Sequence, residues 1–275
     1  MSSDRTPPTG CATRPVVRFE RGTRTEDDDR LAEEVPVAMH FDGAPFAVMM
    51  TTPADLEDFA RGFALTEGKV DDVRDIVHIE VREVLEGIVV DVRTAAGLTA
   101  PPGRAETTAS RELPGRSGCG ICGSRELEDV VRHPAPVAAG PTLSVDAIER
   151  ALEALRAQQP INAFTGSVHA AAWALPDGSI VMVREDVGRH NALDKLIGAM
   201  GADGTDPRAG FLVITSRASY EMVTKAAVAG ITVVAAISAP TALAVHLAAD
   251  CGVTLIGFAR PGRFNVYSRP ERIAG

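Results

Sequence analysis

The sequence lacks the features that would place the protein on a nucleic acid, in a membrane or outside the cell. Its 275 residues carry a net charge of −9, whereas nucleic-acid binding needs a basic face. The longest apolar run, residues 226–239, contains Gly230 and is too short to span a bilayer. Residues 1–10 are polar and lack the apolar stretch of a secretory signal. We therefore expect a cytoplasmic protein that binds neither nucleic acid nor a membrane.

Cysteine is scarce, and half of it stands in one place. Four cysteines in a chain of 275 residues do not form a disulfide framework, and cytoplasmic thiols stay reduced. Cys119 and Cys122 form a Cys-x-x-Cys pair within residues 117–124, where glycines flank both thiols. Glycine lets the backbone bend freely and lets a large partner approach closely. The segment is therefore predicted to present two exposed thiols.

Three kinds of chemistry suit such a pair. Structural zinc needs four ligands; the pair with His133 gives three and no fourth stands near, so no metal site is predicted. Thioredoxin-type pairs usually follow a strand and open a helix, whereas this pair follows a long polar segment. The third kind is sulfur transfer, in which one thiolate holds a persulfide and the second thiol assists its release. The residues alone leave redox chemistry and sulfur transfer open.

The signature of a zinc deaminase is incomplete. That signature is His-x-Glu followed later by Pro-Cys-x-x-Cys. Residues 168–171 read Val-His-Ala-Ala, so alanine replaces the glutamate that serves as general acid and base, and the cysteine pair comes before the histidine. We expect no deaminase chemistry. His169 and His246 are interpreted as core residues, and His190, at a predicted helix start, as a ligand contact.

The N-terminal part of the chain predicts a small domain after a tail. Residues 1–14 are expected to be a disordered tail containing Cys11, and the acidic run 26–29 a solvated loop. Residues 15–94 are expected to form a small α+β domain. Its predicted elements are two strands within 35–50, a helix opened by 52–53 and closed by Gly68, and two strands within 77–92.

Two further regions follow. Residues 95–140, rich in Gly, Pro, Thr, Ser and Arg, are expected to be a mobile loop that carries the dithiol. Residues 141–275 alternate between apolar runs and helices, which predicts an α/β domain with a largely parallel sheet covered on both faces, with Cys251 in the core. The expected strands are 164–174 and 180–183, which the turn Pro-Asp-Gly at 176–178 joins into a predicted hairpin, and then 211–215, 231–237, 253–258 and 264–267. The expected helices are one capped by Ser144, one after Gly188, 220–229 and 241–250.

Three polar clusters follow strand ends in this α/β domain, where ligands of such sheets bind. They are residues 184–191, 216–217 and 260–263. Arginine suits phosphate and guanine-type groups, and helix N-termini near His190 and Ser219 would add backbone N–H groups for an anion. Surface salt bridges are the alternative for any single arginine. The three clusters together favour a ligand that bears phosphate.

Several longer motifs resemble the family of formate dehydrogenase accessory sulfurtransferases, FdhD. The similarity runs from about residue 35 to residue 273, and several long motifs in one order are far more specific than a lone Cys-x-x-Cys. The motifs are Gly-Cys-Gly-Ile-Cys-Gly at 118–123, Phe-Thr-Gly-Ser-Val-His at 164–169, Glu-Asp-Val-Gly-Arg-His-Asn-Ala-Leu-Asp-Lys at 185–195, Ser-Arg at 216–217 and Gly-Phe-Ala-Arg-Pro-Gly-Arg at 257–263.

The resemblance implies a fold and a role. It implies a larger, C-terminal, three-layer domain similar to cytidine deaminase without its zinc site, beside the smaller N-terminal α+β domain. It also implies a homodimeric sulfur carrier, in which a cysteine desulfurase loads sulfur on Cys119 with Cys122 assisting. The sulfur would pass to the bis-molybdopterin guanine dinucleotide form of the molybdenum cofactor, as bound cargo, before this enters formate dehydrogenase. The residues implied to contact the guanine dinucleotide are Phe258, Ala259, Arg260, Pro261, Gly262 and Arg263.

Overall fold

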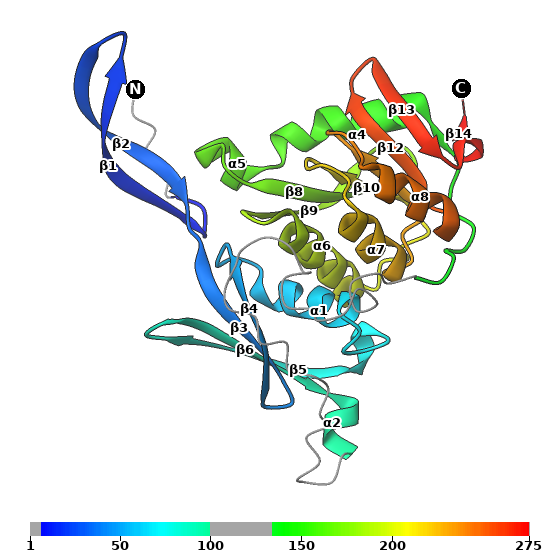
Figure 1. Cartoon of the computed structure of the whole chain (residues 1–275), viewed down its shortest axis with the longest axis horizontal. Helices are drawn as coiled ribbons and strands as arrows, with labels where there is room; N and C mark the ends of the chain where they lie inside the picture. The colour runs from blue at the N-terminus through cyan, green and yellow to red at the C-terminus, as the bar shows by residue number, and fades with distance from the viewer. Residues whose placement is uncertain (1–6, 100–133, 275) are drawn as a thin grey trace.

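The computed structural model of the chain describes residues 7–99 and 134–274 (Figure 1). Its first element is an antiparallel ribbon of β1 (Cys11–Glu20) and β2 (Thr23–Ala32), which projects from the rest of the molecule. Residues 11–14 therefore form part of a strand, and the acidic run 26–29 lies in β2, so the expectations of a tail and a loop there are wrong. The charges are tolerated because Asp27 pairs with Arg18 of the facing strand.

The chain then forms a four-stranded sheet with one helix packed on it. The strand order is β4-β3-β6-β5, with β3 parallel to β6 and the outer pairs antiparallel. Helix α1 buries Phe59, Ala60, Phe63 and Ala64, as their helical spacing predicts. The two predicted strand pairs are confirmed. The elements are β3 (Val35–Phe41), β4 (Ala44–Thr51), α1 (Leu56–Thr66), a 3-10 turn (Val73–Asp75), β5 (Ile76–Val84) and β6 (Gly87–Thr94).

The C-terminal half is built around a six-stranded sheet of order β13-β12-β11-β10-β8-β9. Strands β10, β11 and β12 are parallel, whereas β8 is antiparallel to β10, β9 to β8, and β13 to β12. The sheet is mixed, so the prediction of a largely parallel sheet is wrong, because hairpins at both sides reverse the chain. The strands are β8 (His169–Ala174), β9 (Ile180–Asp186), β10 (Phe211–Ile214), β11 (Val233–Ala236), β12 (Thr254–Arg260) and β13 (Arg263–Ser268).

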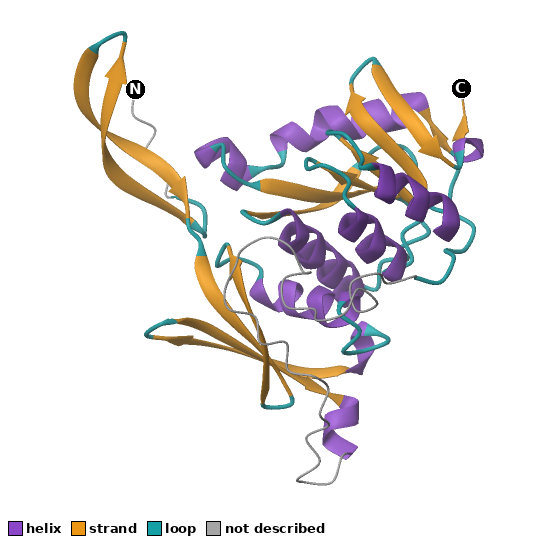
Figure 2. Ribbon diagram, in the orientation of Figure 1, coloured by secondary structure: helices purple, strands orange, loops and turns teal. Residues whose placement is uncertain are grey.

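Helices cover both faces of this sheet (Figure 2). Helices α6, α7 and α8 pack on one face, and α4 packs on the other. The apolar stripe predicted for α4 is buried, and Ser144 caps this helix by accepting a hydrogen bond from the N–H of Ala147. The helices are α4 (Val145–Ala157), α6 (Arg189–Asp203), α7 (Tyr220–Val228) and α8 (Ala242–Cys251).

The two halves meet where α1 crosses α6 at a pair of glycines. A Cβ atom on Gly62 would lie 1.8 Å from the carbonyl oxygen of Asp194, and one on Gly198 would lie 1.8 Å from that of Asp58. No side chain fits at either position, so the helix backbones touch. A buried ion pair lies beside this crossing, with Lys225 Nζ 2.8 Å from Asp194 Oδ2.

Short elements complete the fold. Strand β7 (Leu143–Ser144) pairs in parallel with β14 (Ile273–Ala274). Helix α2 (Ala95–Thr99) lies in the region expected to be a loop. Phe164, expected in a strand, lies in the short helix α5 (Pro160–Thr165). Within residues 7–99 and 134–274, no helix is long and apolar enough to cross a membrane.

Candidate functional site

Four strands of the six-stranded sheet run in one direction, so their carboxyl ends meet at one edge. Strand β9 ends at Asp186, β10 at Ile214, β11 at Ala236 and β12 at Arg260. The three predicted polar clusters follow β9, β10 and β12, and the fold brings all three to this edge. Because open α/β sheets bind ligands beyond the carboxyl ends of their strands, this edge is the candidate site.

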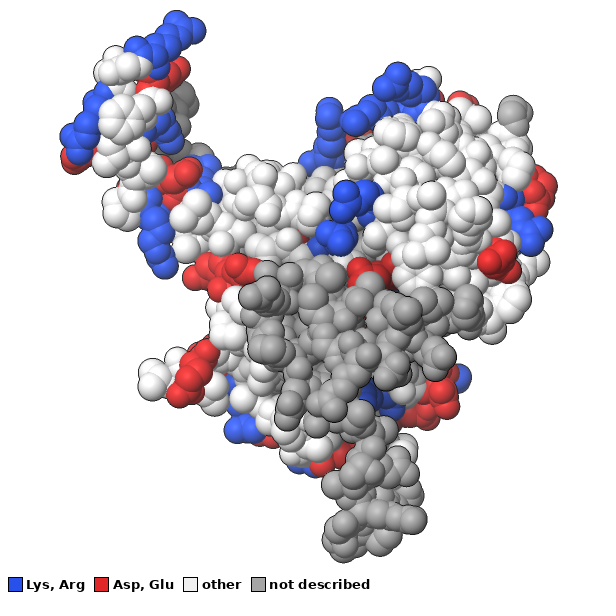
Figure 3. Space-filling view, viewed as in Figure 1, with Lys and Arg blue, Asp and Glu red and all other residues white. Residues whose placement is uncertain are grey.

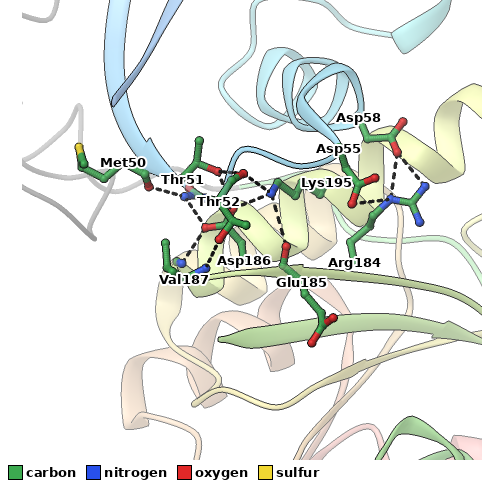
Figure 4. Close-up of polar contacts among 12 residues, drawn as sticks. Met50, Thr51, Thr52, Asp55, Asp58, Arg184, Glu185, Asp186, Val187 and Lys195 are labelled. Atoms are coloured by element: carbon green, nitrogen blue, oxygen red, sulfur yellow. Dashed lines mark hydrogen bonds and ion pairs between the residues drawn. The ribbon is translucent and has the colours of Figure 1, made fainter. Parts of the chain in front are cut away.

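The charged residues at the end of β9 form ion pairs and hydrogen bonds with other residues of the protein (Figure 4). Lys195 Nζ lies 2.7 Å from Asp186 Oδ2, and both side chains are fully buried. Asp186 also accepts hydrogen bonds from the backbone N–H groups of Thr52 and Gly188 at 3.0 Å and 2.7 Å. A buried ion pair is tolerated only where such extra donors compensate for lost hydration. Asp186 therefore ties α6 to the end of β4.

Its two neighbours in β9 also have protein partners. Arg184 donates from Nε and Nη2 to Asp58 Oδ2 at 2.9 Å and 2.7 Å. Glu185 accepts hydrogen bonds from the backbone N–H groups of Ile161 and Asn162 at 2.8 Å and 2.9 Å. Burial raises the pKa of Glu185, and these two hydrogen bonds oppose the rise. For Arg184 the alternative of a salt bridge is therefore correct. Residues 184–186 contact other parts of the protein and stabilise the fold, whereas we expected them to contact a ligand.

The arginines of the other two clusters are exposed to solvent. Arg217, Arg260 and Arg263 are exposed, and no carboxylate of residues 7–99 or 134–274 forms an ion pair with any of them. Some exposed arginines elsewhere have partners, as Arg74 pairs with Asp72, whereas others, such as Arg21 and Arg156, form no ion pair with a described residue. Basic side chains gather over the tip of the β12–β13 hairpin, where Arg260 faces Arg263 (Figure 3). Among the residues that the structure describes, no carboxylate competes with an anionic ligand for these guanidinium groups.

The backbone next to these arginines has an unusual conformation. Phe258 has φ 52°, in the left-handed region that bulky residues rarely adopt, and its side chain is 41 % exposed. Its N–H donates to the carbonyl oxygen of Ser238 at 3.1 Å, which joins β12 to the end of β11. Ala259 is fully buried in the core, whereas Pro261 and Gly262 form an exposed turn. The segment 258–263 thus presents one aromatic ring and two guanidinium groups on a buried anchor.

Two histidines lie at the same edge. His190 Nε2 is 2.8 Å from Oε2 of Glu221, in the first turn of α7, a partner that we did not predict. Burial, together with the charges of Arg189 and His190, lowers the pKa of His169 at the start of β8.

The interpretation of His246 as a core residue is wrong, because His246 is exposed, whereas His169 is half-buried. An acidic residue in the first helical turn after Ser219 was the available sequence signal for Glu221.

The cysteines fall into two groups. Cys119 and Cys122, with His133, lie outside the described residues. Cys251 is buried, as predicted, with Sγ 3.6 Å from the carbonyl oxygen of Pro134, and burial raises its pKa. Cys11 lies in β1. Among residues 7–99 and 134–274, no group of three or more His, Cys, Asp or Glu side chains is arranged to hold a metal ion.

The sequence matches the model of the FdhD/NarQ family over residues 32–274. The chain therefore belongs to this family. The match spans the four-stranded sheet, the six-stranded sheet and the segment between them. The ribbon of β1 and β2 precedes it, apart from the last residue of β2.

Individual relatives cover nearly the whole chain. The sulfur carrier protein FdhD of Xanthomonas campestris pv. campestris (strain B100) is 52 % identical over 266 residues, which are 96 % of this chain and 92 % of the relative. The protein of the same name from Cupriavidus necator is 47 % identical over 274 residues, covering 99 % and 93 %. A crystal structure from Desulfotalea psychrophila, described as a formate dehydrogenase accessory protein, has TM-score 0.73 and 26 % identity, covering 96 % of this chain and 99 % of that one.

Proposed function

We propose that this protein is a sulfur carrier that serves formate dehydrogenase. The observation that carries the proposal is the similarity, at about 50 % identity over nearly the full chain, to relatives named sulfur carrier protein FdhD. The glycine-flanked pair of Cys119 and Cys122 supplies the thiols that sulfur transfer requires. Cys119 takes up the sulfur as a persulfide, and Cys122 assists its release.

The proposed cargo is the molybdenum cofactor in its bis-molybdopterin guanine dinucleotide form. The carboxyl edge of the six-stranded sheet suits this substrate because Arg217, Arg260 and Arg263, which form no ion pair within residues 7–99 and 134–274, offer forked donors to phosphate and guanine. Phe258 presents an exposed ring on which a base can stack. In this proposal, segment 258–263 contacts the guanine dinucleotide through Phe258, Arg260 and Arg263, while buried Ala259 anchors it.

In the proposed transfer both thiols take part, because release of the sulfur as sulfide requires two electrons. Cys119 thiolate first accepts a sulfane sulfur from a persulfide of a cysteine desulfurase, which leaves as a thiolate. The Cys122 thiol then forms a disulfide with Cys119 and reduces the sulfane sulfur to sulfide by two electrons. The sulfide replaces one oxo ligand of the cargo metal, and this oxygen leaves as water with the two protons of the persulfide and the thiol. A reductant of the dithiol class restores the two thiols.

The proposal extends to the setting of the protein. It acts in the cytoplasm as a sulfurtransferase and homodimer, with a cysteine desulfurase as donor and formate dehydrogenase as recipient of the sulfurated cargo. A cofactor-binding chaperone without sulfur chemistry is the second candidate, favoured by the exposed arginines Arg217, Arg260 and Arg263. The two candidates differ in whether the cysteines are required.

Intact-protein mass spectrometry tests the proposal. The protein is incubated with a cysteine desulfurase and cysteine, and its mass is compared with and without reductant. We expect the gain of one sulfur atom that reductant removes, absent in Cys119→Ala and retained in Cys122→Ala. Cys251→Ala is the matched control, because this buried thiol should not be loaded. Absence of sulfur on the wild type, under conditions that load a known acceptor, would favour the chaperone.

A further inference from the structure

The buried pair of His190 and Glu221 has fewer partners than the other buried pair that joins α6 to α7. In that other pair, both carboxylate oxygens of Asp194 accept hydrogen bonds, from Lys225 and Thr66. Glu221 contacts His190 through Oε2, at 2.8 Å from Nε2, whereas its Oε1 is buried and has no hydrogen-bond partner within residues 7–99 and 134–274. A buried pair that serves only to join two helices is normally satisfied at every polar atom. The exception indicates a further role for His190 and Glu221.

The pair lies at the carboxyl edge of the six-stranded sheet. His190 is in the first turn of α6, which follows β9, and Glu221 is in the first turn of α7, which follows β10 (Figure 1). Segment 258–263 lies at the end of β12, two strands from β10, and two strand spacings amount to about 10 Å. A dinucleotide cofactor is longer than this, so a cargo held at its guanine end can reach the pair.

His190 has the surroundings of an acid–base residue. Its side chain is 8 % exposed, so the protein holds the ring and still leaves part of it accessible to a ligand. Burial alone would raise the pKa of Glu221, but the contact with His190 and the charges of Arg189 and Lys225 outweigh burial and lower it. Glu221 is therefore a carboxylate at neutral pH. A carboxylate beside Nε2 keeps a proton on that nitrogen, which leaves Nδ1 to exchange protons.

The second histidine at this edge is less suited to proton transfer. Burial, followed by the charges of Arg189 and His190, lowers the pKa of His169, and the charge of Asp186 opposes this change. A lowered pKa makes His169 a weak base that stays neutral at pH 7. His169 also forms no ion pair with a carboxylate of the described residues, so no such partner fixes its tautomer. Of the two histidines, His190 has the orienting carboxylate.

We propose that His190, oriented by Glu221, is the acid–base residue of the proposed sulfur transfer, on which this inference rests. When the sulfide replaces the oxo ligand of the cargo, a metal–oxygen bond breaks and a metal–sulfur bond forms. The oxygen needs two protons to leave as water, and these come from the persulfide and from the Cys122 thiol. His190 takes up one of them at Nδ1 and returns it to the departing oxygen, so it is neutral before and after the step. The two electrons pass only between sulfur atoms.

The test separates the loading of sulfur from its delivery. The full chain is first loaded by a cysteine desulfurase with cysteine, and the gain of one sulfur atom is measured by intact-protein mass spectrometry. The loaded protein is then mixed with the oxo form of the bis-molybdopterin guanine dinucleotide molybdenum cofactor, and the loss of this sulfur is followed in time. We expect His190→Ala to load like the wild type and to deliver at least about a hundredfold more slowly. His78→Ala, at an exposed position of β5, is the control and should match the wild type in both stages.

Two measurements distinguish proton transfer from a structural role. Imidazole added to His190→Ala should restore part of the delivery rate, because it replaces the missing ring as a proton carrier. Glu221→Gln should slow delivery by about tenfold, which corresponds to the loss of one bond to a charged group. In the double variant, Glu221→Gln should cause no further loss, because Glu221 acts only through His190, whereas independent structural effects would add.

The outcomes separate this inference from the proposed function. Delivery by His190→Ala at the wild-type rate would overturn the inference and leave the proposed function intact. Additive losses in the double variant, or no response of His190→Ala to imidazole, would also overturn it and make the pair structural. Absence of loading on the wild type would overturn the proposed function and this inference with it. Circular dichroism checks the folding of each variant, and His190→Gln replaces His190→Ala if the alanine variant does not fold.

Discussion

Two groups of charged residues lie near the same edge of the six-stranded sheet and differ in what they contact. Arg184, in β9, forms an ion pair with Asp58. Two positions further along the chain, Asp186 forms a fully buried ion pair with Lys195. Arg260 and Arg263, at the β12–β13 tip, have no ion-pair partner within residues 7–99 and 134–274. We call the first group closed, because its charges have partners within the protein, and the second group open, because its charges have no such partner among the described residues.

The difference teaches that position at a sheet edge does not by itself make a residue a ligand contact. The closed group faces the N-terminal half of the chain, whose β4 and α1 supply donors and carboxylates to it. The open group lies on a hairpin that extends away from that half. A charge acts on a ligand only where the protein itself has not already neutralised it. Variants in the closed group should therefore change folding, and variants in the open group should change binding.

The largest effect is expected for Lys195→Met. The substitution leaves the carboxylate of Asp186 buried without its cation, which costs about 3–5 kcal/mol of unfolding free energy. Urea denaturation followed by circular dichroism measures the change. The double variant Lys195→Met with Asp186→Asn removes both charges and should recover part of the loss. A change no greater than that of the exposed control Asp206→Asn would mean that the closed group is not structural.

A smaller loss of stability is expected for Gly62→Ala. The added Cβ would meet the backbone oxygen of Asp194 at 1.8 Å, so α1 must move away from α6, at a cost of about 1–3 kcal/mol. The same denaturation experiment measures the change. Glu57→Ala, at an exposed position of the same helix, is the control and should change stability by no more than about 0.5 kcal/mol. Equal stability of Gly62→Ala and the wild type would contradict the close helix crossing.

For the open group, Arg260→Gln should leave stability within about 0.5 kcal/mol, as is usual for surface substitutions. Its effect should appear in binding of guanosine diphosphate, used as a probe for the guanine dinucleotide, with affinity lower by about tenfold. Arg74→Gln, in an exposed pair with Asp72, is the matched control and should bind like the wild type. Unchanged affinity in Arg260→Gln would remove the β12–β13 tip from the proposed cargo site.

The smallest effect concerns His169, between the two groups. Its folded-state pKa is lower than the usual 6.5, first through burial and then through Arg189 and His190. The unfolded chain therefore binds the proton more tightly, so the contribution to stability is complete above pH 6.5 and is lost as pH falls through the folded-state pKa. The stability difference between wild type and His169→Gln should shrink on acidification from pH 8 to below the folded-state value, measured in buffer free of phosphate. A pH-independent difference would contradict the shift.

Much of the fold could be predicted because it depends on local patterns. The buried stripe of α1, the Ser144 cap of α4 and the hairpin before Gly87 follow from residue spacing and turn chemistry. The turn at 176–178 predicts the antiparallel hairpin of β8 and β9, whereas the antiparallel pairing of β8 with β10 and of β13 with β12 could not be predicted, because apolar runs read alike in parallel and antiparallel sheets. The ribbon of β1 and β2 was missed because its polar sequence is stabilised by cross-strand pairing and not by burial.

The sequence by itself determined the positions of most helices and strands, the family, and the three arginine-bearing segments at strand ends. Only the tertiary structure decided which of these charges remain open to a ligand. The reason is that the neutralising partners are distant in sequence: Arg184 meets Asp58, 126 positions away, and Lys195 contacts the backbone of Thr52 from 143 positions away. The contact of His190 with Glu221 arises in the same way, since only the packing of α6 beside α7 brings them together.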